Sequence, residues 1–155
     1  MDIETLAREK GERAEELFRS GYGCAQAVLL AFEKESGLNK EQLIKLGSPF
    51  GGGMGRMRLT CGAVTAAVML SGLLCSNGNR AEDYERVQSI AAELTKINGS
   101  IICAELLKGV SVTSGSAPEQ RDNEYYKRRP CPKLCNIAAF VTARHCLCEK
   151  TAEKN

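Results

Sequence analysis

The sequence predicts an all-α fold, a compact bundle of about six helices around a central apolar helix at residues 61–75. Apolar residues recur at helical spacing along almost the whole chain, without the alternation that is typical of β-strands. The 155 residues match one ordinary domain, and 43% of them are hydrophobic, which is enough for a core without disulfide cross-links. We therefore expect a single domain over residues 1–155.

Three helices are predicted before the central one. Residues 3–19 have an amphipathic pattern, and Gly11 weakens the middle of this helix by about 1 kcal/mol relative to alanine. Residues 24–36 form the second helix, with apolar side chains at the expected steps. Asn39 is a suitable capping residue for a short third helix.

The central helix follows a loop that contains four glycines between positions 51 and 55. We expect unusual backbone angles or a close backbone approach in this loop. The helix at 61–75 is apolar nearly all round, which is typical of a buried helix. The polar stretch at 109–129 predicts an irregular loop, and its length of about twenty residues is typical of a mobile or functional segment. Three further helices are expected at residues 82–98, 100–108 and 132–147.

Four of the eight cysteines lie where a helix is expected to begin: Cys24, Cys61, Cys103 and Cys131. A helix N-terminus offers free N–H groups and a positive dipole end, which favour a thiolate over a thiol. No CxxC motif occurs, so the thioredoxin motif and the short zinc knuckle are absent. Four thiolates would suit tetrahedral zinc or an iron–sulfur cluster. The alternative is that each cysteine simply fills space in the core, as buried free cysteines often do.

The other four cysteines have less specific positions. Cys75 ends the central helix and fits core or helix-end packing. Cys135 lies one turn after the last of the four helix-start cysteines, so it can form a redox pair with it or supply an extra ligand. Cys146 and Cys148 flank one leucine near the C-terminus, where His145 precedes them. This CxC is either a small metal site or part of an exposed segment.

Composition argues against several classes of protein. Lys plus Arg number 21 and Asp plus Glu number 19, so nothing indicates a nucleic-acid or membrane surface. The first 20 residues contain no apolar run typical of a secretory signal, and the apolar run 61–75 is too short to span a membrane. We expect a cytoplasmic protein, in which cysteines serve as metal ligands or reactive thiols rather than structural disulfides. No general acid, general base or substrate pocket is evident, so the sequence does not identify an enzyme.

Several sequence blocks around the helix-start cysteines resemble one known family. The blocks are Gly23-Cys24-Ala25-Gln26-Ala27-Val28, Phe50-Gly51-Gly52-Gly53-Met54-Gly55, Thr60-Cys61-Gly62-Ala63-Val64-Thr65, Cys103-Ala104-Glu105-Leu106-Leu107 and Cys131-Pro132-Lys133-Leu134. They occur in the family's order and extend over nearly the whole chain. The sequence thus resembles the redox-active proteins named for a CGAxxG motif, the C_GCAxxG_C_C family.

The resemblance implies a small helical redox protein marked by four cysteines. A similar domain in a split-Soret type cytochrome is associated with a [2Fe–2S] cluster, so the resemblance implies an iron–sulfur cluster, [2Fe–2S] by this comparison, and electron transfer with a partner protein. Two residues depart from the family pattern: Ala66 replaces the last glycine of the motif, and Cys135 replaces an aliphatic residue. By position, the family's four cysteines match Cys24, Cys61, Cys103 and Cys131.

Two other functions stay open at this point. The first is thiol–disulfide chemistry without a metal, for which the candidate pairs are Cys131 with Cys135 and Cys24 with Cys61. The second is a zinc-stabilised structural or interaction module, although zinc is the less favoured metal here because no short knuckle supplies two ligands. The thin apolar central helix and the rather small polar surface favour a homodimer.

Overall fold

The computed structural model describes the backbone of residues 1–152 and the side chains of residues 1–148. In this part of the chain helices make up the fold, and the only β pairing is one isolated bridge between Thr60 and Ile102. The predicted all-α class is therefore confirmed. Within the same residues, no helix combines the length and the apolar character needed to cross a membrane.

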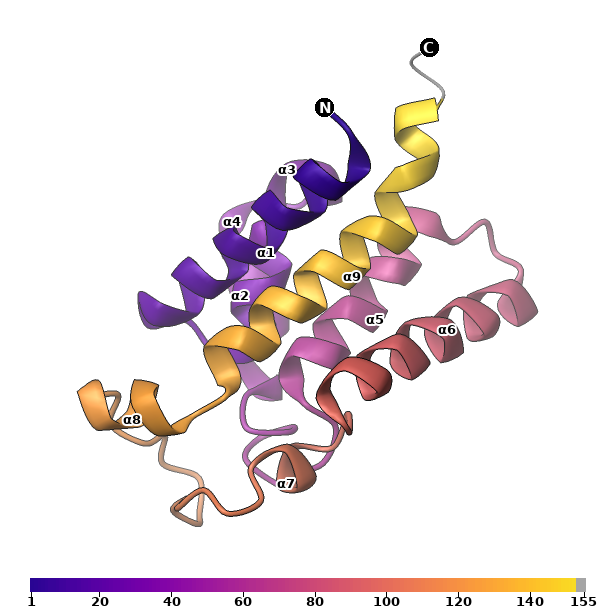
Figure 1. Cartoon of the computed structure of the whole chain (residues 1–155). Helices are drawn as coiled ribbons and strands as arrows, with labels where there is room; N and C mark the ends of the chain where they lie inside the picture. The colour runs from indigo at the N-terminus through magenta and orange to yellow at the C-terminus, as the bar shows by residue number, and fades with distance from the viewer. Residues whose placement is uncertain (153–155) are drawn as a thin grey trace.

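The described residues form nine α-helices and one short 3-10 helix (Figure 1). The sequence predicted about six helices, and the additional ones are short. In chain order the elements are α1 (Ile3–Arg19), α2 (Cys24–Ala31), α3 (Glu33–Ser36), α4 (Lys40–Gly47), η1 (Ser48–Phe50), α5 (Gly62–Cys75), α6 (Arg80–Asn98), α7 (Cys103–Leu106), α8 (Asn123–Arg128) and α9 (Cys131–Ala152).

Two of the short helices correct the sequence-based boundaries. Residues 24–36 are not one helix, because Phe32 has φ −110° and ψ 20° and separates α2 from α3. The segment 109–129 is not irregular throughout, because α8 forms near its end. The Asp122 side chain caps α8 by accepting a hydrogen bond from the Tyr125 N–H at 2.8 Å, and the Tyr125 ring stacks on Phe18.

The helices pack as one bundle in which α9 and α5 occupy the middle. Helix α9 contacts α1, α2, α5 and α6, while α5 contacts α2, α3, α6 and α9; Figure 1 shows α1 and α9 side by side along most of their length. The first half of α5 is buried as predicted, but its last turn reaches the surface, where Leu73 is 50% exposed. The largest fully buried side chains are Phe18, Phe32, Leu43, Leu70, Ile90 and Leu94.

Helices α1 and α9 approach each other closely at Gly11. A Cβ atom at this position would lie 2.4 Å from Oδ1 and 2.9 Å from the backbone oxygen of Asn136 on α9. The Asn136 side chain is held there, because its Nδ2 donates a hydrogen bond to Oε2 of Glu15 at 2.8 Å. Gly11 is thus more than a weak point in a helix, because the absence of a side chain allows α1 and α9 to pack closely.

We expect Gly11→Ala to lower the free energy of unfolding by about 1–3 kcal/mol, because the added methyl group overpacks the contact between α1 and α9. This loss outweighs the gain in helix propensity of about 1 kcal/mol. Urea unfolding followed by circular dichroism measures the difference.

The matched control is Gly72→Ala in α5, where an added Cβ would have no atom within 4 Å. Since this alanine clashes with nothing, we expect it to leave the stability unchanged or to raise it by about 1 kcal/mol. Equal stabilisation by both alanines would contradict the close contact at Gly11.

Candidate functional site

The candidate site is a cavity of about 610 Å³ at the end of the bundle where several helices begin. Cys24 is the first residue of α2, Cys61 caps the N-terminus of α5, Cys103 opens α7 and Cys131 opens α9. The prediction that these cysteines lie at helix starts is confirmed. All four line this one cavity, although each lies in a different part of the chain; Figure 1 shows the starts of α5, α7 and α9 towards the same end of the molecule.

Gly62 allows the starts of α2 and α5 to touch. A Cβ atom at Gly62 would lie 2.6 Å from the backbone oxygen of Phe50 and 3.3 Å from Cβ of Cys24. A side chain at this position would therefore push α5, together with the adjacent Cys61, away from Cys24. The glycine that follows Cys61 in the sequence thus has a specific role in bringing two of the cysteines together.

Backbone hydrogen bonds join the segments that carry Cys61 and Cys103. The Cys61 N–H donates to the carbonyl of Ile101 at 2.9 Å, and the Cys103 N–H donates to the carbonyl of Leu59 at 2.6 Å. The bridge between Thr60 and Ile102 lies between these two bonds. This short pairing fixes the two cysteines relative to each other, and no residue pattern in the sequence indicated it.

The glycine-rich loop before Cys61 forms part of the cavity wall. Gly52, Gly53 and Gly55 have φ values of 64°, 71° and 57°, which confirms the predicted unusual backbone angles. A Cβ atom at Gly53 would lie 2.6 Å from Cβ of Cys103, so the loop also makes a close backbone approach. Three residues with side chains share this left-handed conformation, which is unfavourable for them: Met54, Arg56 and Arg58.

A fifth cysteine belongs to the same cavity. Cys135 lies one turn after Cys131 on α9, is fully buried, and its Sγ lies 3.8 Å from the backbone oxygen of Cys24. Cys131 and Cys135 both lie close enough to Cys24 to shift the pKa of its thiol. These interactions therefore centre on Cys24, whereas the sequence suggested the pairs Cys131 with Cys135 and Cys24 with Cys61.

The helix-start position does not lower the pKa of these thiols overall. Burial raises the pKa of Cys61 to about 11, and it outweighs the backbone N–H groups of Ala63 and Val64, which act in the opposite direction. The neighbouring thiols Cys131 and Cys103 raise the pKa of Cys61 further. The N–H groups at the helix start do lower the pKa of Cys61, as expected, but burial raises this pKa by more.

The pKa values of Cys131 and Cys24 are raised as well. The hydrogen bond with Cys24 and then burial raise the pKa of Cys131, while the guanidinium of Arg129 acts in the opposite direction. For Cys24, the hydrogen bond with Cys131 favours the thiolate, but the contact with Cys135 and burial outweigh it and raise the pKa. Without a cation among them, these thiols therefore stay protonated near neutral pH.

Hydrogen bonds and ion pairs hold part of the polar segment 109–122 against one side of the cavity; this set of contacts, made by Arg56, Glu119 and Arg129, is called the clamp below. Arg56 donates hydrogen bonds to the carbonyls of Gly115 at 2.8 Å and Thr113 at 2.9 Å. Glu119 forms ion pairs with Arg56, at 3.7 Å, and with the buried Arg129. The segment was predicted to be either mobile or functional, and its hydrogen bonds hold it against the cavity. The cavity-lining residues of this segment are Ser116, Pro118, Glu119 and Arg121.

Glu119 is ionised in this clamp. Burial alone would raise the pKa of its carboxyl group, but the Thr113 N–H and the Arg129 guanidinium outweigh burial and lower the pKa. Arg121 is fixed separately, because it donates to the carbonyls of Phe18 at 2.7 Å and Tyr22 at 2.9 Å. The cavity lining therefore contains several guanidinium groups, and the Glu119 carboxylate pairs with two of them, Arg56 and Arg129.

The side chains as they stand do not form a ready metal site. Among the described residues, no group of three or more His, Cys, Asp or Glu side chains is positioned to hold a metal ion. The histidine beside the C-terminal CxC pairs with a carboxylate, since Nε2 of His145 lies 2.7 Å from Oε2 of Glu93. The Cys148 thiol instead donates to the backbone oxygen of His145 at 3.9 Å.

Comparison with known proteins identifies one family. A family model described as "Putative redox-active protein (C_GCAxxG_C_C)" matches residues 22–145, which include all five cavity cysteines. A search of curated proteins and a search of solved structures each returned no match. The family description supports redox activity and names no cofactor.

We expect Glu119→Gln to lower the free energy of unfolding by about 1.5–3 kcal/mol at pH 7, because two arginines lose a charged partner. The carboxyl pKa is lowered in the folded protein, so its contribution is present above the ordinary pKa of about 4.3 and is lost as the pH falls further. Urea unfolding should therefore show a constant difference between the two proteins from pH 7 to about pH 5, and this difference should shrink as the pH falls below about 4.3.

Glu41→Gln is the control for this pair, since Glu41 pairs with Lys45 at 3.0 Å on the surface. We expect its effect to stay within about 0.5 kcal/mol. A difference between wild type and Glu119→Gln that does not depend on pH would contradict the ionised clamp.

We expect iodoacetamide to modify Cys61 of the metal-free protein slowly at neutral pH and faster as the pH rises towards 11, because the thiolate is the nucleophile. The raised pKa also means that ionisation opposes folding, so stability should fall as the pH rises above about 8.5. Mass spectrometry of the Cys61 peptide measures the rate at each pH, with glutathione as the reference thiol. A Cys61 rate that levels off below pH 9 would contradict the raised pKa.

Proposed function

We propose, from the premise that this chain belongs to the C_GCAxxG_C_C family of redox-active proteins, that its cysteine-lined cavity holds an iron–sulfur cluster and transfers electrons. The proposed ligands are Cys24, Cys61, Cys103 and Cys131, and the proposed cluster is [2Fe–2S]. The observation that carries the proposal is that four thiols, each from the start of a different helix, line one cavity.

The chemistry of the donor set fits such a group. Iron–sulfur clusters are held by four cysteine thiolates, and their potentials are set by burial and by hydrogen bonds to the sulfurs. The backbone N–H groups of Ala63 and Val64 favour the Cys61 thiolate, and Arg58 donates to Sγ of Cys103 at 3.8 Å. When bound, a [2Fe–2S] cluster supplies a centre that accepts and releases one electron.

The protein's own residues would place this centre in a largely buried, positively charged environment. Cys61, Cys103 and Cys131 are each at most 8% exposed, so water has little access to these three sulfurs, whereas Cys24 is partly exposed. The guanidinium groups of Arg58 and Arg129 offset the negative charge that four thiolates bring. In this proposal a partner protein supplies or accepts the electron.

The raised pKa values are consistent with a site that needs a cation. Metal ligation requires deprotonated thiols, so binding releases the protons that burial otherwise keeps on the sulfurs. The side chains must also rotate, because no three of them are positioned for a metal as they stand in the described residues. We therefore expect cluster assembly to be coupled to proton release and to a rearrangement of the thiols.

A second function is favoured by the position of Cys24 beside Cys131 and Cys135. Both of these cysteines influence the Cys24 thiol in the same cavity, so Cys24 can form a disulfide with either and leave the other as a resolving thiol. In this alternative the protein cycles between dithiol and disulfide without a metal. Zinc also suits four thiols, but no contact in the cavity favours zinc over iron.

We expect protein purified without oxygen to be coloured and to contain about two iron and two sulfide ions per chain. Iron and sulfide assays, together with visible spectroscopy, measure this directly. A colourless protein that takes up no iron after anaerobic reconstitution would contradict the cluster proposal. If such a protein gains and loses two thiols reversibly, and Cys24→Ser abolishes this, the disulfide alternative holds instead.

We expect Cys61→Ser to lose the iron while keeping most of its helical circular dichroism, because a proposed ligand is removed from a helix cap rather than from the helix interior. The matched control is Cys75→Ser, which makes the same chemical change at the other end of α5. We expect the control to keep its iron and to lose about 1 kcal/mol of stability. Equal loss of iron in both variants would show that the ligands are wrongly assigned.

A further inference from the structure

A second pair of cysteines lies between the same two helices, far from the cavity. Cys61 caps the start of α5 and Cys75 is its last residue, while Cys131 is the first residue of α9 and Cys146 lies four turns further along. Since a helix rises 1.5 Å per residue, Cys75 lies about 20 Å from Cys61. The second pair is therefore separate from the cavity, and neither of its members lines it.

The two thiols of this pair are neighbours. Sγ of Cys75 lies 4.0 Å from the backbone oxygen of Cys146, and the Cys75 thiol lies close enough to raise the pKa of the Cys146 thiol. Helices α5 and α9 pack directly against each other, so the contact joins two elements of the bundle core. The residues are 71 positions apart, and only the packing of the two helices brings them together.

We propose that Cys75 and Cys146 are a redox modification site, at which a low-molecular-weight disulfide of the glutathione class introduces a reversible cross-link between α5 and α9. The proposal is independent of any cofactor in the cavity, because it uses neither the cavity thiols nor their proposed ligand roles. It assigns a function to two cysteines that the proposed redox centre leaves unused.

The exposure of the two sulfurs sets the order of the steps. Cys75 is partly exposed, whereas Cys146 is 4% exposed, so only Cys75 is open to an external disulfide. The Cys75 thiolate attacks one sulfur of that disulfide, forming a mixed disulfide and releasing one small thiol, which takes up the proton. The Cys146 sulfur then attacks the sulfur of Cys75 and releases the second small thiol. Two protein thiols are oxidised, and one disulfide is reduced to two thiols.

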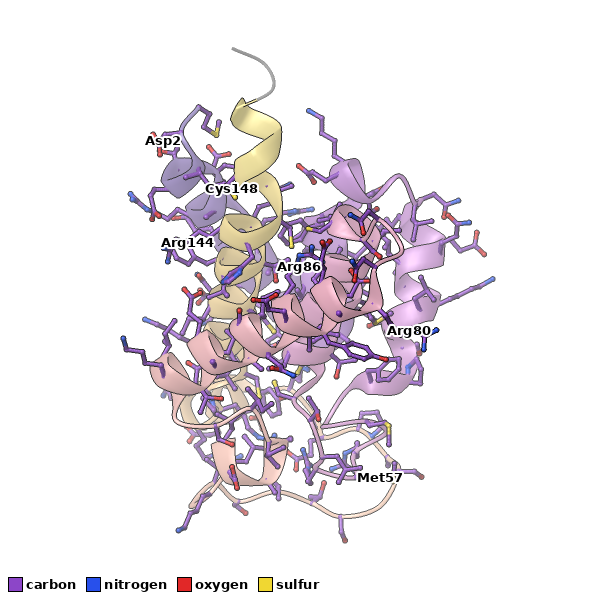
Figure 2. The ribbon with its side chains drawn as sticks, turned by 90° about the vertical axis from the view of Figure 1, so that its right-hand side faces the viewer. Asp2, Met57, Arg80, Arg86, Arg144 and Cys148 are labelled. Atoms are coloured by element: carbon purple, nitrogen blue, oxygen red, sulfur yellow. The ribbon has the colours of Figure 1, made fainter. Side chains whose placement is uncertain are left out.

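The surroundings of Cys146 keep it protonated until that second step. Burial is the main cause that raises its pKa, followed by the Cys75 thiol, while the guanidinium of Arg86 acts in the opposite direction. Figure 2 shows Arg86 on α6 in front of α9, and Cys148 higher on α9, at the opposite end of the molecule from Met57 in the glycine-rich loop region. Arg86 is itself paired with Asp83 at 3.1 Å.

The test is to oxidise the reduced full-length protein with glutathione disulfide, alkylate the remaining thiols and digest it without reduction. We expect mass spectrometry to find a peptide that links Cys75 to Cys146, and reduction by dithiothreitol to remove it. Since a cross-link that closes a long loop restricts the unfolded chain, the midpoint of thermal unfolding should rise on oxidation. The linkage map distinguishes this cross-link from any disulfide among the cavity cysteines.

Cys148→Ser is the matched control, and we expect it to keep both the linked peptide and the rise in the unfolding midpoint. Cys75→Ser should lose both, and this variant changes a partly exposed helix end, so it should fold even if Cys146→Ser does not. Failure to find the Cys75–Cys146 peptide in folded, oxidised wild-type protein would overturn the proposal. Linkage of Cys148 to either partner in place of this pair would overturn it as well.

Discussion

The close contact between the starts of α2 and α5 is the constraint on which the candidate site depends. Gly62 lets the two helices touch, because a side chain there would collide with the Phe50 carbonyl and with Cys24. The same contact places Cys61 where the pairing with the segment around Ile102 can bring in Cys103. Helix α9 then adds Cys131 and Cys135. The positions of four of the five cavity sulfurs therefore follow from where the helices begin, while Cys135 lies one turn into α9; the bundle behind them holds those helix starts in place.

Electrostatics explains why such an arrangement suits redox chemistry. Buried thiols that contact each other resist ionisation, and the N–H groups of the helix starts are too weak to reverse this for Cys61. The thiols therefore remain protonated unless a cation or a disulfide bond changes the balance. The guanidinium groups of Arg58, Arg121 and Arg129 in the wall favour the negative charge that ligating thiolates would bring. Both proposed functions of the cavity replace the thiol protons, either with a metal centre or with a disulfide bond.

The sequence was sufficient for the fold class and for the cysteine positions, because helical periodicity and capping are local properties. Asn39 caps α4 as predicted, accepting from the Gln42 N–H at 2.9 Å. Tertiary packing decided what the sequence missed: Gly11 allows a close helix contact, and α8 depends on the ring of Phe18. The signs of the pKa shifts were also missed, since they depend on how deeply each thiol is buried. The position of Cys135 in the cavity could be predicted from the sequence, because its one-turn spacing from Cys131 places both residues on the same face of α9.

The central claim is that sulfurs from four separate helix starts share one iron–sulfur cluster. Iron K-edge X-ray absorption of protein prepared without oxygen tests this most directly, because it reports which atoms surround each iron. The account predicts an iron environment of sulfur alone, with a second iron as the nearest metal, and loss of this signal in Cys131→Ser but not in Cys135→Ser. Iron bound through nitrogen or oxygen, or a sulfur environment that depends on Cys135 and not on Cys131, would contradict it.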